Sequence, residues 1–233
     1  MVSSLKHTID KHNGKLFIND KDFIAAFTDG CWVVKWKWEK EAPKQLQTRI
    51  AEYGCVNKSH IRASYDETIM KWINNKWLVP YDEKDCVGIL PMLAVFQHTK
   101  NKVRPVFDFR QLNDSILNHT GSDNTVVCNY KLRKWRTVGD DLTVVDLQDA
   151  YLQIYVDPSC HKYQCIRYKE QTYALTRLGF GLCSAPKVMQ MIVKKVLSQD
   201  NTIANCCDAY IDDIVVQHNK VCLLYTSPSP RDA

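Results

Sequence analysis

Ala209-Tyr210-Ile211-Asp212-Asp213-Ile214-Val215-Val216 places two adjacent carboxylates between two short apolar runs. Runs of this kind favour strands, and the pair between them favours a tight turn. A third acid, Asp146, ends another apolar run at residues 142–146. Because strand side chains alternate between faces, one acid of the pair can point at a bound ion while Asp146 arrives from an adjacent strand end. The pattern predicts three carboxylates at one edge of a sheet.

Three carboxylates supply hard oxygen ligands, which magnesium binds together with water and substrate phosphates. An Asp-Asp pair between apolar runs is also typical of a plain hairpin turn, and a single acid such as Asp146 is typical of a strand end. The residues at these positions therefore leave both a metal site and a structural turn open.

Four segments of the chain stand in a characteristic order. They are RPVFDFRQLN at residues 104–113, VVDLQDAY at 144–151, FGLCSAP at 180–186 and YIDD at 210–213. This order resembles the fingers segment and the palm motifs of reverse transcriptases, and the resemblance extends from about Trp36 to Gln217. The sequence of residues 175–182, LTRLGFGL, is most similar to the polymerases of LTR retrotransposons.

The resemblance implies an α+β fold with reverse-transcriptase-like fingers and palm, in which helices cover an antiparallel palm sheet and the chain ends before the thumb. We expect an N-terminal extension of unknown role at residues 1–35, the fingers region at 36–140, the palm with its catalytic motifs at 141–220, and a disordered, non-native-looking tail at 221–233. The tail ends in YTSPSPRDA, which resembles translated adapter sequence. It enters no functional argument.

The family chemistry is nucleotidyl transfer from a dNTP to a primer 3′-hydroxyl on an RNA or DNA template. Two metal ions about 4 Å apart stabilise the attacking and leaving oxygens in such reactions. The resemblance implies that Asp146, Asp212 and Asp213 are the catalytic acids and that they bind two Mg²⁺ ions, with Mn²⁺ as the alternative. The backbone carbonyl of Leu147 is an additional expected ligand.

A nucleotide pocket is expected from the same motifs. Its predicted members are Arg104, Asp149, Ala150, Tyr151, Phe180 and Gly181, with Lys100 and Lys102 as candidate phosphate contacts. Arginine offers a rigid fork to phosphate oxygens, and backbone amides at a turn into a helix cradle phosphate. In this family the aromatic residue at the position of Tyr151 blocks a ribonucleotide 2′-hydroxyl. A core tyrosine with a hydrogen-bonded hydroxyl is the alternative for Tyr151.

Composition adds weaker constraints. The 233 residues include 31 Lys and Arg against 26 Asp and Glu, and the net charge of +5 suits a phosphate-rich partner without requiring one. The 10 cysteines fall in apolar runs without a Cys-x-x-Cys pair or a signal peptide, which favours a reducing compartment. No apolar stretch approaches the roughly 20 residues that cross a bilayer. We therefore expect an intracellular protein, cytoplasmic or in a nucleoprotein particle, without a membrane partner.

Spacing and turn signals predict further elements. They are a helix opened by a capping box at residues 64–67, strands at 90–97 and 103–109, a helix at 126–136, a buried strand at 142–146, antiparallel strands at 152–156, 163–168 and 172–175, and a helix from an N-cap at Ser184 to Leu197 whose buried face includes Val196. Asp108 and Arg110 are expected to form a structural pair.

The leading interpretation is a fragment of a retrotransposon Pol polyprotein, whose thumb, RNase H and integrase lie outside the chain and which is inactive by itself. A metal-dependent nuclease is one alternative, because nucleases also gather carboxylates around two ions. It leaves Tyr151 and Phe180 without a role. A catalytically silent nucleic-acid-binding remnant is the other alternative.

Overall fold

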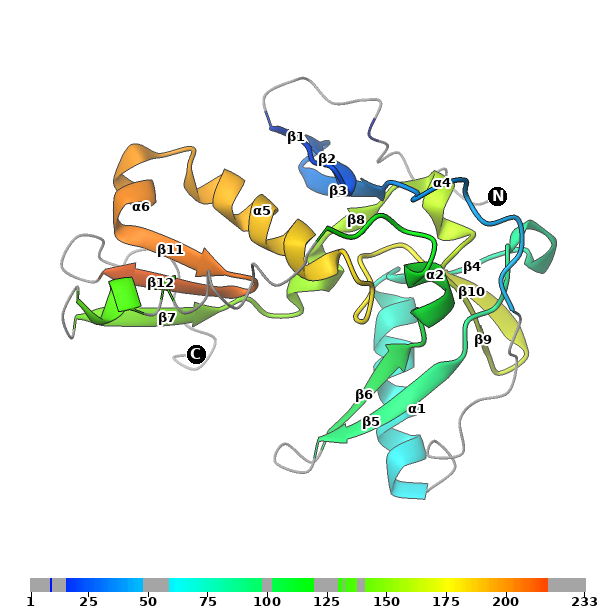
Figure 1. The fold of residues 1–233 in the computed structure, drawn as a ribbon. Helices are drawn as coiled ribbons and strands as arrows, with labels where there is room; N and C mark the ends of the chain where they lie inside the picture. Colours follow the sequence, from blue (N-terminus) through cyan, green and yellow to red (C-terminus); the bar gives the residue numbers. More distant parts are fainter. Residues whose placement is uncertain are drawn as a thin grey trace. The chain divides into compact units, whose positions relative to one another are not determined.

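The structure is a computed structural model that describes residue 9 and residues 16–47, 59–97, 102–119, 130–131, 133–137 and 141–217 (Figure 1). The chain divides into two compact units. Unit 1 combines Met1–His119 with Tyr151–Ala185, and unit 2 combines Thr120–Ala150 with Pro186–Ala233. The expected boundaries of fingers and palm stay predictions.

The first sheet of unit 1 has four strands. Their order is β1 (Phe17–Asn19), β2 (Phe23–Thr28), β3 (Cys31–Trp36) and β8 (Tyr155–Val156). The first three form an antiparallel meander, whereas β8 pairs with β3 in parallel. Phe23 and Val33 are fully buried and Trp36 is nearly so. The extension expected at residues 1–35 therefore contributes strands to a sheet core.

The second sheet of unit 1 has the order β4 (Leu78–Pro80), β10 (Gln171–Leu175) and β9 (Cys165–Tyr168). Strands β9 and β10 form the predicted hairpin, and Lys169 and Glu170 at its turn have φ values of 46° and 64°. Two positive φ values are typical of a type I′ turn, whose twist matches that of the strands.

The prediction of a strand over residues 152–156, antiparallel to the next, was wrong. Only Tyr155–Val156 is a strand, and a short helix, α4 (Pro158–His161), follows it. The Asp157 carboxylate accepts a hydrogen bond from the Ser159 amide at 3.0 Å. With proline at its first turn, this capped sequence favours a helix over a hairpin turn.

Helix α1 (Ser59–Asn74) packs against the hairpin formed by β5 (Met92–Gln97) and β6 (Lys102–Phe107). Its buried stripe has helical spacing and consists of Ile61, Tyr65, Ile69 and Trp72. The predicted start at Ser64 was wrong. The Ser64 hydroxyl accepts a hydrogen bond from the Val103 amide of β6 at 3.3 Å, and does not cap the helix.

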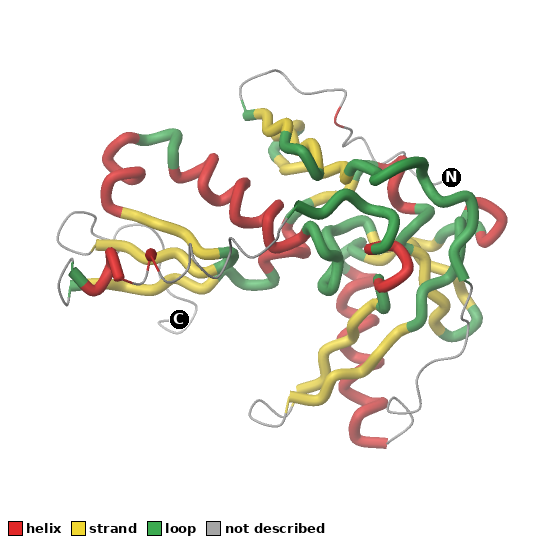
Figure 2. The backbone as a smooth tube through the Cα atoms, in the orientation of Figure 1, coloured by secondary structure: helices red, strands yellow, loops and turns green. Residues whose placement is uncertain are grey.

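Unit 2 contains a three-stranded antiparallel sheet. Its order is β11 (Cys207–Tyr210), β12 (Asp213–Gln217) and β7 (Leu142–Asp146). Figure 2 shows helices on one side of these strands, α5 (Ala185–Leu197) and α6 (Asn201–Cys206). Residues 130–131 and 133–136 are helical, which confirms that predicted helix over its described part.

Two burial predictions in unit 2 were wrong. Strand β7 is not buried, since Val144 is 63% exposed. In α5, Val188 and Ile192 are buried as predicted, but Val196 is 47% exposed. The Ser184 hydroxyl has no hydrogen-bond partner among the described residues and so does not cap α5. The Ala185 amide donates to the Leu182 carbonyl at 3.1 Å, so a backbone turn precedes the helix.

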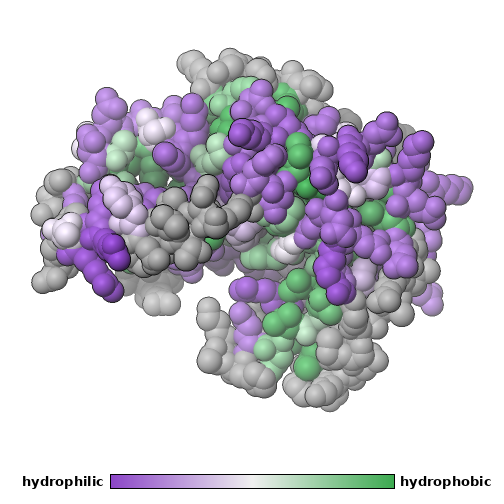
Figure 3. Space-filling view, in the orientation of Figure 1, coloured by the Kyte–Doolittle hydropathy of each residue, from purple (hydrophilic) through white to green (hydrophobic). Residues whose placement is uncertain are grey.

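The described residues thus form an α+β structure, as predicted, whose strand pairs are antiparallel except for β3 with β8. Figure 3 shows apolar side chains on the visible face over β5 and β6, where Val95 is 48% exposed. The cysteines within the described residues carry free thiols. No helix in the described part of the chain is long and apolar enough to span a bilayer.

Candidate active site

The acidic pair lies at the tip of the β11–β12 hairpin. Tyr210 pairs with Asp213, so the loop consists of two residues, Ile211 and Asp212. Ile211 has a φ of 59°. A β-branched side chain at positive φ crowds its own backbone, and hairpins normally place glycine at such a position. Backbone strain of this kind is concentrated at functional sites, where the surrounding structure holds it.

The third acid lies on the neighbouring strand. The β7–β12 register places Asp146 directly opposite Asp213. Side chains of directly opposed residues lie on the same face of an antiparallel sheet. The Leu147 amide also donates a hydrogen bond to the Asp212 carbonyl at 3.1 Å, which ties the end of β7 to the hairpin tip. The structure therefore brings together the elements that carry the three predicted acids.

The acids repel one another. Burial first, and then the charges of Asp212 and Asp146, raise the pKa of Asp213 above its usual value. Asp146 and Asp213 are exposed and Asp212 is half-buried, so ions from solvent can reach this edge. An oxygen-only, anionic donor set suits a hard divalent cation. Within the described residues, however, no three His, Cys, Asp or Glu side chains are already gathered to hold a metal, and the metal ligands stay predictions.

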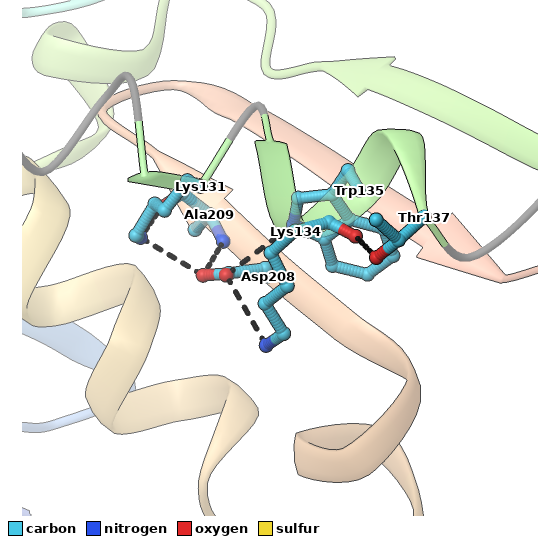
Figure 4. A network of polar contacts seen from close by, with 6 residues as sticks. All are labelled: Lys131, Lys134, Trp135, Thr137, Asp208 and Ala209. Carbon is cyan, nitrogen blue, oxygen red and sulfur yellow. Dashed lines mark hydrogen bonds and ion pairs between the residues drawn. The ribbon is translucent and has the colours of Figure 1, made fainter.

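The same face of the unit 2 sheet carries a polar network at Asp208 of β11 (Figure 4). The Lys131 ammonium group donates to the Asp208 carboxylate at 2.8 Å and also to the Ala209 carbonyl. The Trp135 indole nitrogen donates to Asp208 at 3.3 Å, and the Lys134 ammonium lies 3.9 Å away. Burial raises the pKa of Asp208, but the contacts with Lys131 outweigh it and the net pKa is lowered. Asp208 thus holds Lys131 and Trp135, from the helical residues 130–131 and 133–136, on β11, two positions before Tyr210.

Three predicted nucleotide-pocket residues lie together in unit 1. The Phe180 ring meets the Tyr151 ring edge to face, with centroids 4.9 Å apart. The Arg104 guanidinium lies 5.3 Å from the centre of the same Phe180 ring. Arg104 is exposed, and both aromatic side chains are half-buried. The arrangement places a cation and two aromatic faces where solvent reaches them, which suits a ligand with phosphate and ring components.

The remaining predicted pocket residues are placed as follows. Gly181 follows Phe180 directly and has a φ of +98°, a conformation that favours glycine. Asp149 has a φ of 50° and precedes a single helical turn at Ala150–Gln153. Lys100 lies outside the described residues. Lys102 begins β6, but its side chain is not described. Phosphate contacts of Asp149 and Ala150 amides stay predictions.

The predicted pair of Asp108 and Arg110 is confirmed as a two-pronged contact. The Arg110 Nε and Nη2 atoms donate to the two Asp108 carboxylate oxygens at 2.9 and 2.6 Å. Sequence reasoning missed Asp208, which binds Lys131 and Trp135, and Asn113, whose side chain bonds the backbone of Gly181 and Cys183. Neither residue belongs to a spacing pattern that identifies its distant partner.

Comparison with known proteins fits this geometry. The family profile of reverse transcriptases (RNA-dependent DNA polymerases) matches residues 96–222, more than half of the chain. The chain belongs to the reverse transcriptase family. Reverse transcriptases are RNA-directed DNA polymerases, and the predicted enzyme class is confirmed at the level of the family.

Similar individual proteins are distant. The chain is 31% identical over 86 residues to the uncharacterized protein K02A2.6 of Caenorhabditis elegans, covering 37% of this chain and 6% of that protein. The foamy viral protease-reverse transcriptase in complex with double-stranded DNA matches with a TM-score of 0.54 at 16% identity, covering 76% of this chain and 28% of that one. A prototype foamy virus protease-reverse transcriptase mutant matches with a TM-score of 0.54 at 18% identity, covering 77% and 22%.

These likenesses support the fold of reverse transcriptase fingers and palm. The chain spans less than a third of the length of each of these three relatives. The activity, substrates and partners of the whole protein therefore belong to the proposal below.

Proposed function

We propose that this chain carries the catalytic acids and the nucleotide pocket of a retrotransposon Pol polyprotein that synthesises DNA from dNTPs on a primed RNA or DNA template. One observation carries the proposal. Asp146 lies opposite Asp213, beside a strained two-residue turn that carries Asp212. A purely structural pairing of β7 with β12 gains nothing from like charges opposite one another, because such pairs destabilise a sheet. A cation-binding role accounts for their cost.

Asp146 and Asp212 are the proposed shared ligands of two Mg²⁺ ions, and Asp213 assists one of them. When bound, such ions stabilise the attacking and leaving oxygens of an in-line displacement at phosphorus. The chain itself contributes alignment. The Leu147 amide holds the Asp212 carbonyl at 3.1 Å, which keeps the β7 end and the hairpin tip in register. Alignment matters because phosphoryl transfer depends chiefly on positioning and electrostatics.

The proposed nucleotide pocket combines a charged phosphate contact with a steric barrier at the sugar. Arg104 is the proposed phosphate contact, since its guanidinium is exposed and fixed beside Phe180. Tyr151 is the proposed barrier to a ribonucleotide 2′-hydroxyl, and Phe180 supports its ring from the side. A ring braced in this way excludes an added hydroxyl by its volume.

The proposed partners are a primed RNA or DNA template, dNTPs, and the thumb, RNase H and integrase regions of the same polyprotein. The retrotransposon-like sequence of residues 175–182 supports the assignment to a mobile element. An intracellular site of action, in the cytoplasm or in a nucleoprotein particle, is part of the same proposal.

Single-nucleotide primer extension, here and below with the chain joined to the downstream Pol sequence that supplies the thumb, tests the function. We expect Mg²⁺-dependent addition of the templated dNTP by this extended wild-type protein and its loss, by orders of magnitude, in Asp146→Asn, while the isolated chain adds little or none. Asp141→Asn is the matched control, because Asp141 is an exposed acid just before β7. Cleavage of the primer-template without dNTPs would identify a nuclease. Binding of the primer-template without either reaction would identify a silent remnant.

A further inference from the structure

Asn113 makes a two-pronged contact with a loop far away in the sequence. Asn113 is the last residue of the short helix α2 (Arg110–Asn113). Its amide nitrogen donates to the Gly181 carbonyl at 2.9 Å, and its amide oxygen accepts from the Cys183 amide at 2.9 Å. One side chain thus satisfies backbone groups on both sides of Leu182.

The loop that Asn113 holds lacks regular secondary structure. It connects β10 to α5 and carries Phe180. Gly181 adopts a φ of +98°, and a Cβ atom built on Gly179 would lie 2.5 Å from the Phe109 ring. The close packing of Gly179 and the left-handed backbone of Gly181 flank Phe180 and set the direction of its side chain. Glycine also has many other conformations available, so the loop needs external contacts to keep this one.

Contacts from the segment at residues 107–113 supply that support. The Phe109 ring packs against Gly179, and a Cβ atom on Gly181 would lie 3.4 Å from the Phe107 carbonyl. These contacts restrict the loop by shape. Asn113 adds direction, because its two hydrogen bonds are satisfied only when the Gly181 carbonyl and the Cys183 amide both point at it.

The held residue is part of the proposed pocket. Phe180 braces Tyr151 from one side and receives the Arg104 guanidinium on its ring. Rotation of the loop backbone at Gly181 would move the Phe180 ring away from both partners. We propose that Asn113 is a positioning residue of the nucleotide pocket, which fixes Phe180 and thereby the Tyr151 and Arg104 side chains. The nucleotide part of this inference rests on the proposed function.

The same helix offers a matched control. Gln111 also makes an amide contact across a long stretch of sequence, since its side chain accepts from the Gln47 amide at 2.8 Å and donates to the Gln47 side chain at 2.9 Å. Neither of these bonds reaches the loop that carries Phe180. Asn113→Leu and Gln111→Leu each remove one such amide from α2.

Two measurements test the proposal, the first on the full chain and the second on the chain joined to its downstream thumb sequence. The first is hydrogen-deuterium exchange of peptides covering residues 179–184. Asn113→Leu is expected to speed exchange at the Cys183 amide about tenfold, because that amide loses its acceptor, while Gln111→Leu leaves it unchanged. Equal exchange in all three proteins would overturn the proposed hold on the loop.

The second measurement is single-nucleotide extension at varied dNTP concentration. We expect Asn113→Leu to raise the KM for dNTP about tenfold with kcat changed less than about twofold, a split that general loss of folded protein does not produce.

Asn113→Asp tests whether both hydrogen bonds are needed, because it keeps the acceptor for the Cys183 amide but sets an oxygen against the Gly181 carbonyl. It is expected to resemble Asn113→Leu. If the wild-type protein with its thumb neither binds nor adds a dNTP, the proposed function and the pocket role are both wrong. The exchange rates would still show whether Asn113 holds the loop. Unchanged KM beside faster exchange would leave Asn113 a merely structural residue.

Discussion

Asp146 lies directly opposite Asp213 in the antiparallel pairing of β7 with β12, so two carboxylates share one face at the end of a three-stranded sheet. Opposed like charges weaken a strand pair. The pKa of Asp213 is raised by burial and by the charges of Asp212 and Asp146, as expected for a carboxylate that its neighbours repel. The folded chain holds a proton on Asp213 more readily than the unfolded chain does. The contribution of Asp213 to the unfolding free energy is therefore lost as the pH rises.

The first prediction concerns Asp213→Asn. As pH rises from the unfolded pKa of 3.8 through the raised folded pKa, the wild-type chain loses the contribution of this group to its unfolding free energy, and the variant does not. The variant should be the more stable protein at neutral pH without divalent ions. Urea unfolding at a series of pH values measures the difference between the two curves.

Magnesium should reverse that ranking. An ion that binds only the folded chain stabilises it by about 1.4 kcal/mol at ten times its dissociation constant, and Asn at position 213 weakens such binding. If Mg²⁺ stabilises both proteins equally, Asp213 takes no part in a cation site.

The second prediction concerns the two lysines at Asp208. Lys131 is 20% exposed at 2.8 Å from the carboxylate, whereas Lys134 is 54% exposed at 3.9 Å. Lys131→Met should lower the unfolding free energy by about 2 kcal/mol, because it removes a charged hydrogen bond from a partly buried acid. Lys134→Met should change it by less than about 0.5 kcal/mol, as exposed pairs do. Chemical denaturation measures both, and equal losses would contradict the assignment.

The pH dependence of the Asp208 network has the opposite sign to that of Asp213. Burial raises the pKa of Asp208, yet Lys131 brings the net pKa below its usual value of 3.8. The stabilisation is present above that value and is lost as pH falls through the lower folded pKa. The advantage of wild type over Asp208→Asn should therefore shrink in acid.

The third prediction concerns the strained turn. Ile211 holds a φ of 59°, which glycine adopts without crowding. Ile211→Gly should raise the unfolding free energy by about 1 kcal/mol, the lower part of the range for such strain. Primer extension should fall in the same variant, because the turn no longer fixes Asp212. Thermal denaturation and extension are measured on one preparation.

Lys76 provides the control for this turn, since it has a φ of 57° without a β-branched side chain. Lys76→Gly should gain less stability than Ile211→Gly and leave extension unchanged. A gain no larger at Ile211 would show that its branched side chain adds no strain.

The hairpin that carries the acids could be predicted from the sequence because the relevant information is local. Two short apolar runs on either side of the Asp212-Asp213 pair indicated β11 and β12, but the two-residue loop consists of Ile211 and Asp212, and Asp213 already belongs to β12. The aromatic character of Tyr151 and Phe180, together with the order of the motifs, likewise indicated residues that the structure brings into contact.

The remaining features depend on partners that local sequence does not specify. The parallel pairing of β8 with β3 joins segments that are far apart in the chain. Ser64 has the sequence of a helix cap, but its hydroxyl is engaged by Val103 of β6. Val144 has the sequence of a buried strand residue and is 63% exposed, because burial depends on what packs over a strand. Asn113 is of the same kind, since its partners lie in a distant loop.

The last prediction concerns sugar selection by Tyr151. Tyr151→Val removes a ring that Phe180 braces at 4.9 Å, and the resulting space should admit a 2′-hydroxyl. We expect the preference for dNTP over rNTP to fall by at least about tenfold, a difference of about 1.4 kcal/mol in transition-state binding. The folded chain should lose about 2 kcal/mol of stability, because Tyr151 is only half-buried. Extension with each nucleotide, at temperatures where the variant is folded, measures the preference.

A comparable truncation elsewhere separates selection from packing. Tyr173 is also half-buried and belongs to β10, in the sheet with β4 and β9. Tyr173→Val should lose similar packing and keep the wild-type preference for dNTP, because Tyr173 is not a residue of the proposed nucleotide pocket. If both variants retain the preference, Tyr151 is a packing residue and the barrier to ribonucleotides lies elsewhere. If both lose it, the selection follows from overall stability and not from the volume of the Tyr151 ring.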